Sequence, residues 1–142
     1  TFEAAAFLRR SGADTGDVKK LFQNDLEGTI AKYDIIQTAR MYKSGIAVAK
    51  VDHTVGRITA AQAADELLNI SGVDTSFVLF PDQEGRVILS ARSMGDVNVQ
   101  VVLEKLGGGG NAATAGAQVP GKTVDEVHQM LLKAIDEYLE DE

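Results

Sequence analysis

Cysteine is absent from the 142 residues of this chain. A disulfide framework and a thiolate zinc site are therefore excluded, and the composition fits a reducing compartment without requiring one. Long apolar runs are also missing, because no segment approaches the roughly 20 residues that span a bilayer. The sequence has neither an initiator methionine nor a signal-peptide pattern. We interpret it as a piece of a longer protein, and the possibility of a membrane anchor elsewhere in that protein stays open.

Positive charge is scarce, because 14 Lys and Arg face 21 Asp and Glu, which gives a net charge of −7. Tight non-specific binding of nucleic acid depends on cations that neutralise phosphates, so a long duplex is not expected as a partner. A pocket for one small phosphate ligand needs only local donors and stays open. The hydrophobic share of 44% and the charged share of 25% are typical of a soluble globular domain with its own core.

The first 44 residues favour helices. Residues 1–10 are rich in alanine and other helix formers, and a second short helix is expected over residues 14–22. A third helix is predicted over residues 25–42, where apolar residues recur at helical spacing. These are Leu26, Ile30, Tyr33 and Ile36. We expect Ser44-Gly45 to mark a domain border, with residues 1–44 as a helical segment and linker and residues 45–142 as a second domain.

From residue 45 onward, strands alternate with helices. Strands are predicted at 46–51, 73–80 and 86–90. A helix between the first two begins near Thr59, which forms a capping box with Gln62. Strand, helix and strand in that order suggest a parallel pair, and the turn at 81–85 makes the next pair a hairpin. The fold class is therefore α/β, with a mixed sheet that is flanked by helices and preceded by a helical appendage.

The last third of the chain is expected to contain two longer helices. The first is capped by Asp96 and ended by Gly107, and the second runs over residues 124–139 behind a capping box of Thr123 and Glu126. Between them a short helix at 111–115 and an edge strand at 116–119 are predicted. The residues expected to be buried on the two longer helices are Val99, Val102, Leu103, Leu106, Val127, Leu131, Ala134, Ile135 and Tyr138.

Four consecutive glycines, Gly107, Gly108, Gly109 and Gly110, precede Asn111. Glycine permits positive φ angles and lets backbone N–H groups approach a ligand, and successive N–H groups form an anion-binding nest. A helix that began at Asn111 would add its dipole to the attraction for phosphate. The alternative is a flexible linker. The patterned sequence on both sides favours a binding loop.

Polar residues near the end of the third strand are further candidates. Ligands of α/β sheets tend to lie beyond the strand ends, where Arg92 could fork onto a phosphate and Ser93 could donate a hydroxyl. Asn98 and Gln100 could bind a base or a ribose. The alternative for all four is an ordinary surface role. The two histidines, His53 and His128, have no partner at a metal-ligand spacing, and surface roles are expected for them.

The stretch from residue 88 to residue 119 resembles the DHH-associated C-terminal domain of DHH-family phosphoesterases. The subtype it is most similar to is the membrane-anchored cyclic di-AMP phosphodiesterase of Gram-positive bacteria. The opening TFEAAAFLRRSGAD resembles the end of that family's catalytic DHH domain. Three segments inside the stretch carry the resemblance: Ser90-Ala91-Arg92-Ser93, Asn98-Val99-Gln100, and Glu104-Lys105-Leu106 running into the glycines.

The resemblance implies a division of labour between two domains. The DHH domain holds paired manganese ions, whose bound hydroxide attacks the phosphorus, and the associated domain closes over the cleft and binds the nucleotide. It implies that Arg92, Ser93 and Gly107–Gly110 hold phosphate, with Asn98, Gln100 and Asn111 as further contacts. This piece would bind no metal and would be inactive alone. A cytoplasmic location, a membrane-anchored parent, contact with the missing DHH domain and a homodimer are further expectations.

Asn111 departs from the family motif, which ends GGGGH. Asparagine donates a hydrogen bond, but unlike histidine it cannot become a cation near neutral pH. Three functions stay open: the substrate-binding part of a cyclic-dinucleotide phosphodiesterase, part of an exonuclease for short oligoribonucleotides, or a nucleotide-binding or assembly module without catalysis. Catalytic residues are not assigned.

Overall fold

The computed structural model describes residues 15–43 and 45–141, with side chains from Leu26 onward, and divides into two units at Ala31 and Lys32. Helix α2 (Thr15–Gln37) is followed by strands β1 (Ala39–Met41) and β2 (Ile46–Lys50). The central elements are α3 (Arg57–Leu67), β3 (Thr75–Pro81) and β4 (Arg86–Ser93). The last are α4 (Val99–Glu104), β5 (Gly109–Gly110), β6 (Thr114–Pro120) and α5 (Val124–Glu140).

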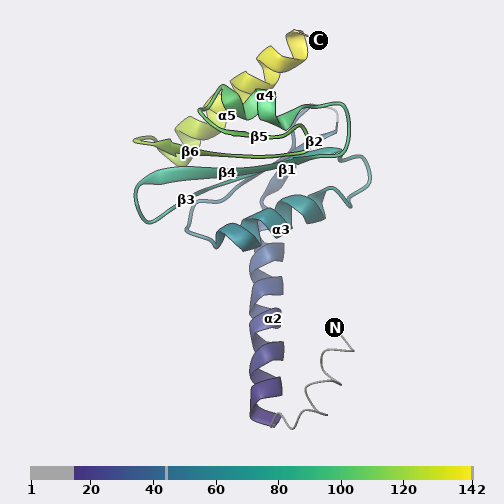
Figure 1. Cartoon of the computed structure of the whole chain (residues 1–142), viewed down its shortest axis with the longest axis vertical. Coiled ribbons are helices and arrows are strands. Elements are labelled where there is room, and N and C mark those ends of the chain that lie inside the picture. Colours follow the sequence, from purple (N-terminus) through teal and green to yellow (C-terminus); the bar gives the residue numbers. More distant parts are fainter. Residues whose placement is uncertain (1–14, 44, 142) are drawn as a thin grey trace. The chain divides into compact units, whose positions relative to one another are not determined.

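Within the described residues, the strands form one six-stranded sheet in the order β1-β2-β3-β4-β6-β5. Strands β2 and β3 are parallel, and the other neighbours are antiparallel. Helices α4 and α5 cover one face of this sheet, and α3 covers part of the other (Figure 1). The predicted α/β fold with a mixed sheet is confirmed, as are the β2–α3–β3 unit and the β3–β4 hairpin.

Side chains of the central strands alternate between two cores. On β3, Phe77 and Leu79 join the core under α4 and α5, whereas Val78 and Phe80 join the core under α3. On β6 the odd-numbered residues Ala115, Ala117 and Val119 join the α5 core. Its even-numbered residues therefore face the α3 side. This alternation decides which face each candidate site residue reaches.

Helix α5 agrees with the sequence pattern, whereas α4 ends at Glu104, before Leu106 and before the predicted stop at Gly107. All nine side chains predicted to be buried on them are buried. The capping box of Thr123 and Glu126 is present at the start of α5. Helix α4 is capped by Asn98, whose side chain accepts from the backbone of Val101, and not by Asp96 as predicted. Asp96 instead accepts from the Tyr138 hydroxyl through its carbonyl oxygen.

The helix predicted over residues 25–42 is wrong at both ends. It is part of the continuous α2, which includes the region of the second predicted helix and ends at Gln37, where Thr38 donates through Oγ1 to the carbonyl of Ile35. Residues 39–41 form an antiparallel edge strand on β2. The apolar stripe is largely exposed, because Leu26, Ile30 and Tyr33 keep 59%, 52% and 49% of their surface, whereas Ile35 is buried.

Three smaller predictions are also wrong. Helix α3 begins at Arg57 after Gly56, without a side-chain cap, so Thr59 and Gln62 lie inside it and form no capping box. No helix starts at Asn111, because the chain turns tightly from β5 into β6 there. Strand β6 lies between β4 and β5, and therefore is not the edge. The helix predicted for residues 1–10 lies outside the described residues, and the domain border at 44 and 45 stays a prediction.

Candidate functional site

Among the described residues, no helix packs closely on the face of β6 that lies on the α3 side of the sheet. Helix α3 packs on β3 and β4, and next to it the sheet surface over β4 and β6 is hollow. The β4–β6 register sets Ser90 opposite Gly116 and Ile88 opposite Gln118. Because a glycine stands at the centre of this surface, the sheet there carries little side-chain bulk. The hollow therefore follows from the sequence of β6.

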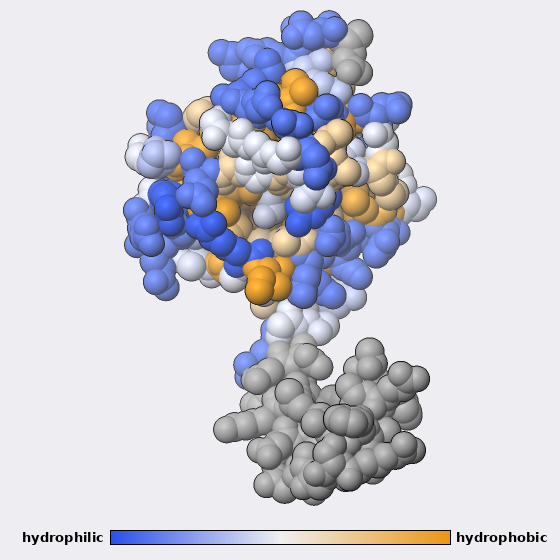
Figure 2. All heavy atoms as spheres, viewed as in Figure 1, coloured by the Kyte–Doolittle hydropathy of each residue, from blue (hydrophilic) through white to orange (hydrophobic). Residues whose placement is uncertain are grey.

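The hollow is a cavity of about 520 Å³ between the first turn of α3, strands β4 and β6 and the glycine loop. Of the described residues that line it, Arg57 alone is charged, and Ser90 and Gln118 supply polar groups. The rest of the lining is Ile88, Leu89, Gly107, Gly108, Gly109, Gly116 and Ala117. Figure 2 shows pale residues of intermediate hydropathy at the centre of the side that carries β5 and β6, with hydrophilic residues around them.

The four glycines have different structural roles. Gly107 has a φ of 82°, which L side chains rarely adopt. A Cβ on Gly108 would lie 2.3 Å from the carbonyl oxygen of Gly116, and one on Gly110 would lie 2.3 Å from that of Thr114. Gly109 has nothing within 4 Å of its Cβ position. Three of the glycines are thus required by the backbone, and Gly109 is left without a structural reason.

Arg92 and Ser93 leave the same strand on opposite faces. Arg92 lies on the α3 side, where Nε donates to Asp65 of α3 at 3.0 Å and Nη1 donates to the carbonyl of Ala91 at 2.8 Å. Its side chain is 18% exposed. Ser93 is buried in the α5 side of the sheet, with its Oγ 3.4 Å from the Oγ1 of Thr75. The structure therefore does not bring the two predicted phosphate ligands together.

Asn98 and Gln100 are engaged on helix α4. The Asn98 side chain caps the helix, and its backbone N–H donates to the Tyr138 hydroxyl at 3.0 Å. Gln100 donates from Nε2 to Glu104 one turn later at 3.1 Å. Neither residue lines the cavity. Of the predicted site residues, the structure brings Gly107, Gly108 and Gly109 to one cavity, with Arg92 two residues from its wall at Ser90.

Asn111 closes the turn that joins β5 to β6. Its Oδ1 accepts from the backbone N–H groups of Ala113 at 3.0 Å and Thr114 at 2.9 Å, and its own N–H donates to the carbonyl of Thr114. One carboxamide oxygen thus satisfies two backbone donors. The asparagine at this place has a structural reason, independent of any ligand.

Replacement of Asn111 by alanine is expected to lower the free energy of unfolding by about 1 kcal/mol, because two backbone donors lose their acceptor in an exposed turn. Asn111→Asp retains an acceptor oxygen and should stay within about 0.5 kcal/mol of the parent chain. Urea denaturation of both variants checks this. Equal stability of the alanine and aspartate variants would contradict the structural role.

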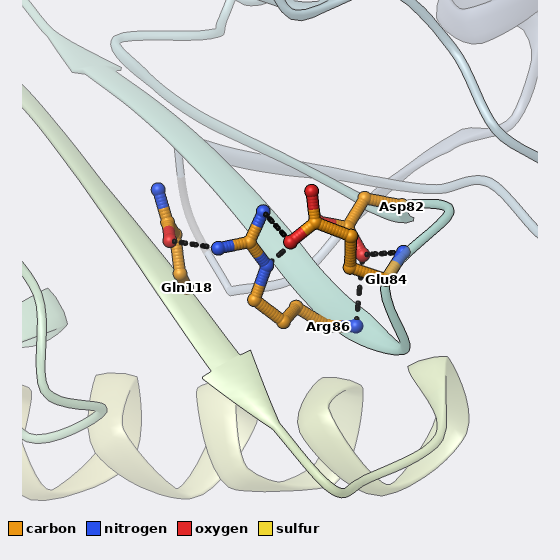
Figure 3. Close-up of polar contacts among 4 residues, drawn as sticks. All are labelled: Asp82, Glu84, Arg86 and Gln118. Carbon is orange, nitrogen blue, oxygen red and sulfur yellow. Dashed lines mark hydrogen bonds and ion pairs between the residues drawn. The ribbon is translucent and has the colours of Figure 1, made fainter.

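The sequence does not predict the role of two arginines at the cavity: Arg57 lines it, and Arg86 holds the lining residue Gln118. Arg86 donates from Nη1 to the Oε1 of Gln118 at 3.1 Å and from Nε to Asp82 at 2.8 Å (Figure 3). This orients the Gln118 amide at the cavity wall. Partial burial alone would raise the pKa of Asp82, but hydrogen bonds from Arg86 and the Glu84 backbone hold that pKa below its ordinary value. Arg57, which lines the cavity itself, lacked a sequence signal because it precedes the supposed capping box.

A family model described as the DHHA1 domain matches residues 43–141. The chain belongs to this family. It is 45% identical over 142 residues to the cyclic-di-AMP phosphodiesterase GdpP of Geobacillus thermodenitrificans, which covers 99% of this chain but 22% of that protein. The bifunctional oligoribonuclease and PAP phosphatase NrnA of Thermus thermophilus is 39% identical over 70 residues, 49% of this chain and 21% of that protein.

Solved structures agree on the fold. An exopolyphosphatase-related protein from Bacteroides fragilis superposes with a TM-score of 0.70 at 19% identity, over 96% of this chain and 43% of that one.

The chain spans about a fifth of the length of GdpP, 22%. Among the residues that the structure describes, no group of three or more His, Cys, Asp or Glu could hold a metal ion. None of the described helices has the length and low polarity needed to cross a membrane.

Proposed function

We propose that this chain is the substrate-binding part of a manganese-dependent phosphodiesterase that hydrolyses a cyclic dinucleotide of the cyclic di-AMP type. The observation that carries the proposal is the cavity beside the glycine loop, whose single charged lining residue among those described is Arg57. Its volume of about 520 Å³ lies in the range of small-molecule sites. The high identity to GdpP over nearly the whole chain supports the choice of substrate class.

The chemistry of the cavity suits a phosphate diester. Backbone N–H groups of the glycine loop can approach phosphate oxygens because Gly109 carries no side chain, and Arg57 supplies a permanent positive charge. No carboxylate is among the described lining residues, so these walls carry no negative charge that would repel an anion. The weakly polar surface formed by Ile88, Gly116 and Ala117 gives a base or ribose a flat place to lie. The cavity thus binds and orients, and it leaves bond cleavage to residues elsewhere in the parent protein.

We propose that the manganese is bound outside the residues described here. The described residues lack a ligand cluster for it, so we derive no step through the metal from them. In the proposal it is held by the DHH domain of the same longer protein, which packs against the open sheet face. A membrane anchor of that parent is likewise part of the proposal.

Arg92 is the partner we assign to a second phosphate. It lies two residues after Ser90 on the same face of β4, just beyond the cavity wall. In the structure, its guanidinium pairs with Asp65 at 3.0 Å. A phosphate that replaces Asp65 as the partner of Arg92 would gain a charge-assisted hydrogen bond, which is stronger than a neutral one.

Calorimetric titration with cyclic di-AMP, linear diadenylate and AMP tests the proposal. We expect saturable binding of a dinucleotide, weakened about tenfold or more in Arg92→Ala, since a charge-assisted hydrogen bond contributes about 1.5–3 kcal/mol. Lys133→Ala, which removes an exposed cation from α5, serves as the matched control. Equal affinity of Arg92→Ala and Lys133→Ala would contradict the role of Arg92.

The second candidate is a role in cleavage of short linear oligoribonucleotides. It is favoured by the 39% identity to NrnA over half of this chain, and by the openness of the sheet face, which accepts an extended chain as well as a ring. Tighter binding of linear diadenylate than of cyclic di-AMP would favour it. The reverse order would favour the cyclic substrate.

A further inference from the structure

A second cavity of about 640 Å³ lies on the other face and at the other end of the sheet. It is bounded by the last turn of α2, by β1 and β2, and by the first half of α5. The glycine-loop cavity lies over β4 and β6 on the α3 side, whereas this one lies over β1 and β2 on the α5 side. Strand β3 lies between the two. A ligand in one therefore does not touch the lining of the other.

Basic groups from three elements line this second cavity. The register of β1 and β2 sets Arg40 opposite Val48, whose side chain belongs to the α5 core. Lys50 is two residues further along β2 and faces the same side. His128 comes from α5 and lies in the same cavity. Three side chains that are far apart in the sequence thus converge, although the chain as a whole is acidic.

Of the cations in this cavity, Arg40 is the one without a described carboxylate partner, whereas Asp34 and Asp125 offset the formal charges of Arg40 and Lys50. Lys50 pairs with Asp125 at 2.7 Å. Arg40 is held through Nη1 by the carbonyl oxygens of Gln37 at 3.2 Å and Ala39 at 2.9 Å, and it makes no ion pair with a described carboxylate. Asp34 is the one carboxylate among the described lining residues. Carbonyl oxygens fix the direction of the guanidinium without neutralising its charge.

Apolar side chains form the remaining wall. Met41, Val48 and Leu132 line the cavity together with the ring of Tyr42. The Tyr42 hydroxyl donates to Asp136 at 2.8 Å, which fixes the ring against α5. Met41 keeps 55% of its surface exposed. A ligand that filled this cavity would therefore need an apolar or planar body as well as negative charge.

We infer that this second cavity binds a small anion that carries an apolar or planar body, of the class of a nucleoside monophosphate. Arg40 and Lys50 meet the phosphate, and His128 donates from the helix side. Met41, Tyr42 and Leu132 cover the body. The inference does not rest on the proposed function, because it uses a separate cavity with separate residues.

The chain provides its own reporter for this site, because it has two histidines. Burial, and then the neighbouring Lys50, lower the pKa of His128 from its ordinary value, against the opposing effect of Asp125. Arg40 and Asp34 are the other charged groups in the same cavity. A bound phosphate favours the protonated imidazole and should raise that pKa. His53, exposed in the loop after β2, is the internal reference.

The test is an NMR titration of the two imidazole rings with AMP, adenosine and inorganic phosphate. We expect AMP to shift the His128 signals in a saturable way and to raise the pKa of His128, with His53 unchanged. Adenosine and inorganic phosphate should each bind at least about tenfold more weakly, since each lacks one half of the recognition. Equal movement of both histidines, or none, would overturn the inference. Adenosine or phosphate binding as tightly as AMP would overturn the ligand class.

Variants locate the site. Arg40→Ala should weaken AMP binding at His128 about tenfold. Met41→Ala, at a position that is 55% exposed, should weaken it severalfold. Lys133→Ala is the matched control on α5 and should leave the affinity within about twofold. Arg57→Ala, in the other cavity, should not affect the His128 titration. An unchanged affinity in both Arg40→Ala and Met41→Ala would refute the site.

Discussion

Gly108→Ala is expected to lower the free energy of unfolding by about 3 kcal/mol, and Gly109→Ala by no more than about 1 kcal/mol. The added Cβ at Gly108 would meet the backbone oxygen of Gly116 at 2.3 Å and the Cβ of Ala117 at 2.6 Å. Those atoms belong to β6 and cannot move without breaking its pairing with β4. At Gly109 the same methyl group points into open space.

For ligand binding we expect the opposite order, with Gly109→Ala weakening the affinity more than Gly108→Ala does. Gly109 lines the glycine-loop cavity, so a methyl group there takes up space and pushes a phosphate away from the backbone donors. Gly109→Ala should therefore fold like the parent chain and bind a dinucleotide about tenfold more weakly. Thermal denaturation and calorimetry together measure the two effects. A Gly109→Ala chain that binds as tightly as the parent would show that this glycine does not serve a ligand.

Charge reversal at Arg57 is the second large effect we expect. Arg57→Glu replaces the one charged residue among the described lining of the glycine-loop cavity by a carboxylate. Loss of a charge-assisted hydrogen bond and the new repulsion should together weaken dinucleotide binding about a hundredfold. Arg57 is exposed at the first position of α3, and an acidic residue suits a helix N-terminus. Stability should therefore change by less than about 0.5 kcal/mol.

The matched control for Arg57→Glu is Lys133→Glu, which makes the same change of net charge at an exposed position on α5. It should leave dinucleotide binding within about threefold, because the charge is remote and screened by salt. Repeating both titrations at higher ionic strength separates local contact from the general effect of net charge. Equal losses in the two variants would mean that Arg57 acts only through overall electrostatics.

Much of the fold follows from periodicity. The five inner positions of α5, from Val127 to Tyr138, are all buried, and the capping box of Thr123 and Glu126 marks the start of that helix. The sequence does not predict strand β1, because no Gly or Pro separates residues 39–41 from the end of α2 and because pairing with β2 is a tertiary effect. Asn111 after the glycines predicts a helix start, but an asparagine side chain can equally accept the backbone N–H groups of a turn, as it does here.

Part of the candidate cavity could be predicted from the sequence. Four glycines between patterned segments predict a loop, and three of them line the cavity, while their role in binding stays a prediction. The opposite directions of Arg92 and Ser93 follow from strand alternation, but their burial depends on which face α3 and α5 cover. Arg57 and Gln118 reach the cavity only through sheet order, since β6 lies beside β4. No local pattern contains that information.

The two edges of the sheet are unusually short. Strand β1 has 3 residues and β5 has 2, whereas β3 has 7 and β4 has 8. Pro120, which has no backbone N–H, ends β6 next to the part that β5 leaves uncovered. A sheet with such edges offers little for a foreign strand to pair with, which protects it against edge-to-edge aggregation. Contacts of this domain with other chains are therefore expected to use side chains more than strand pairing.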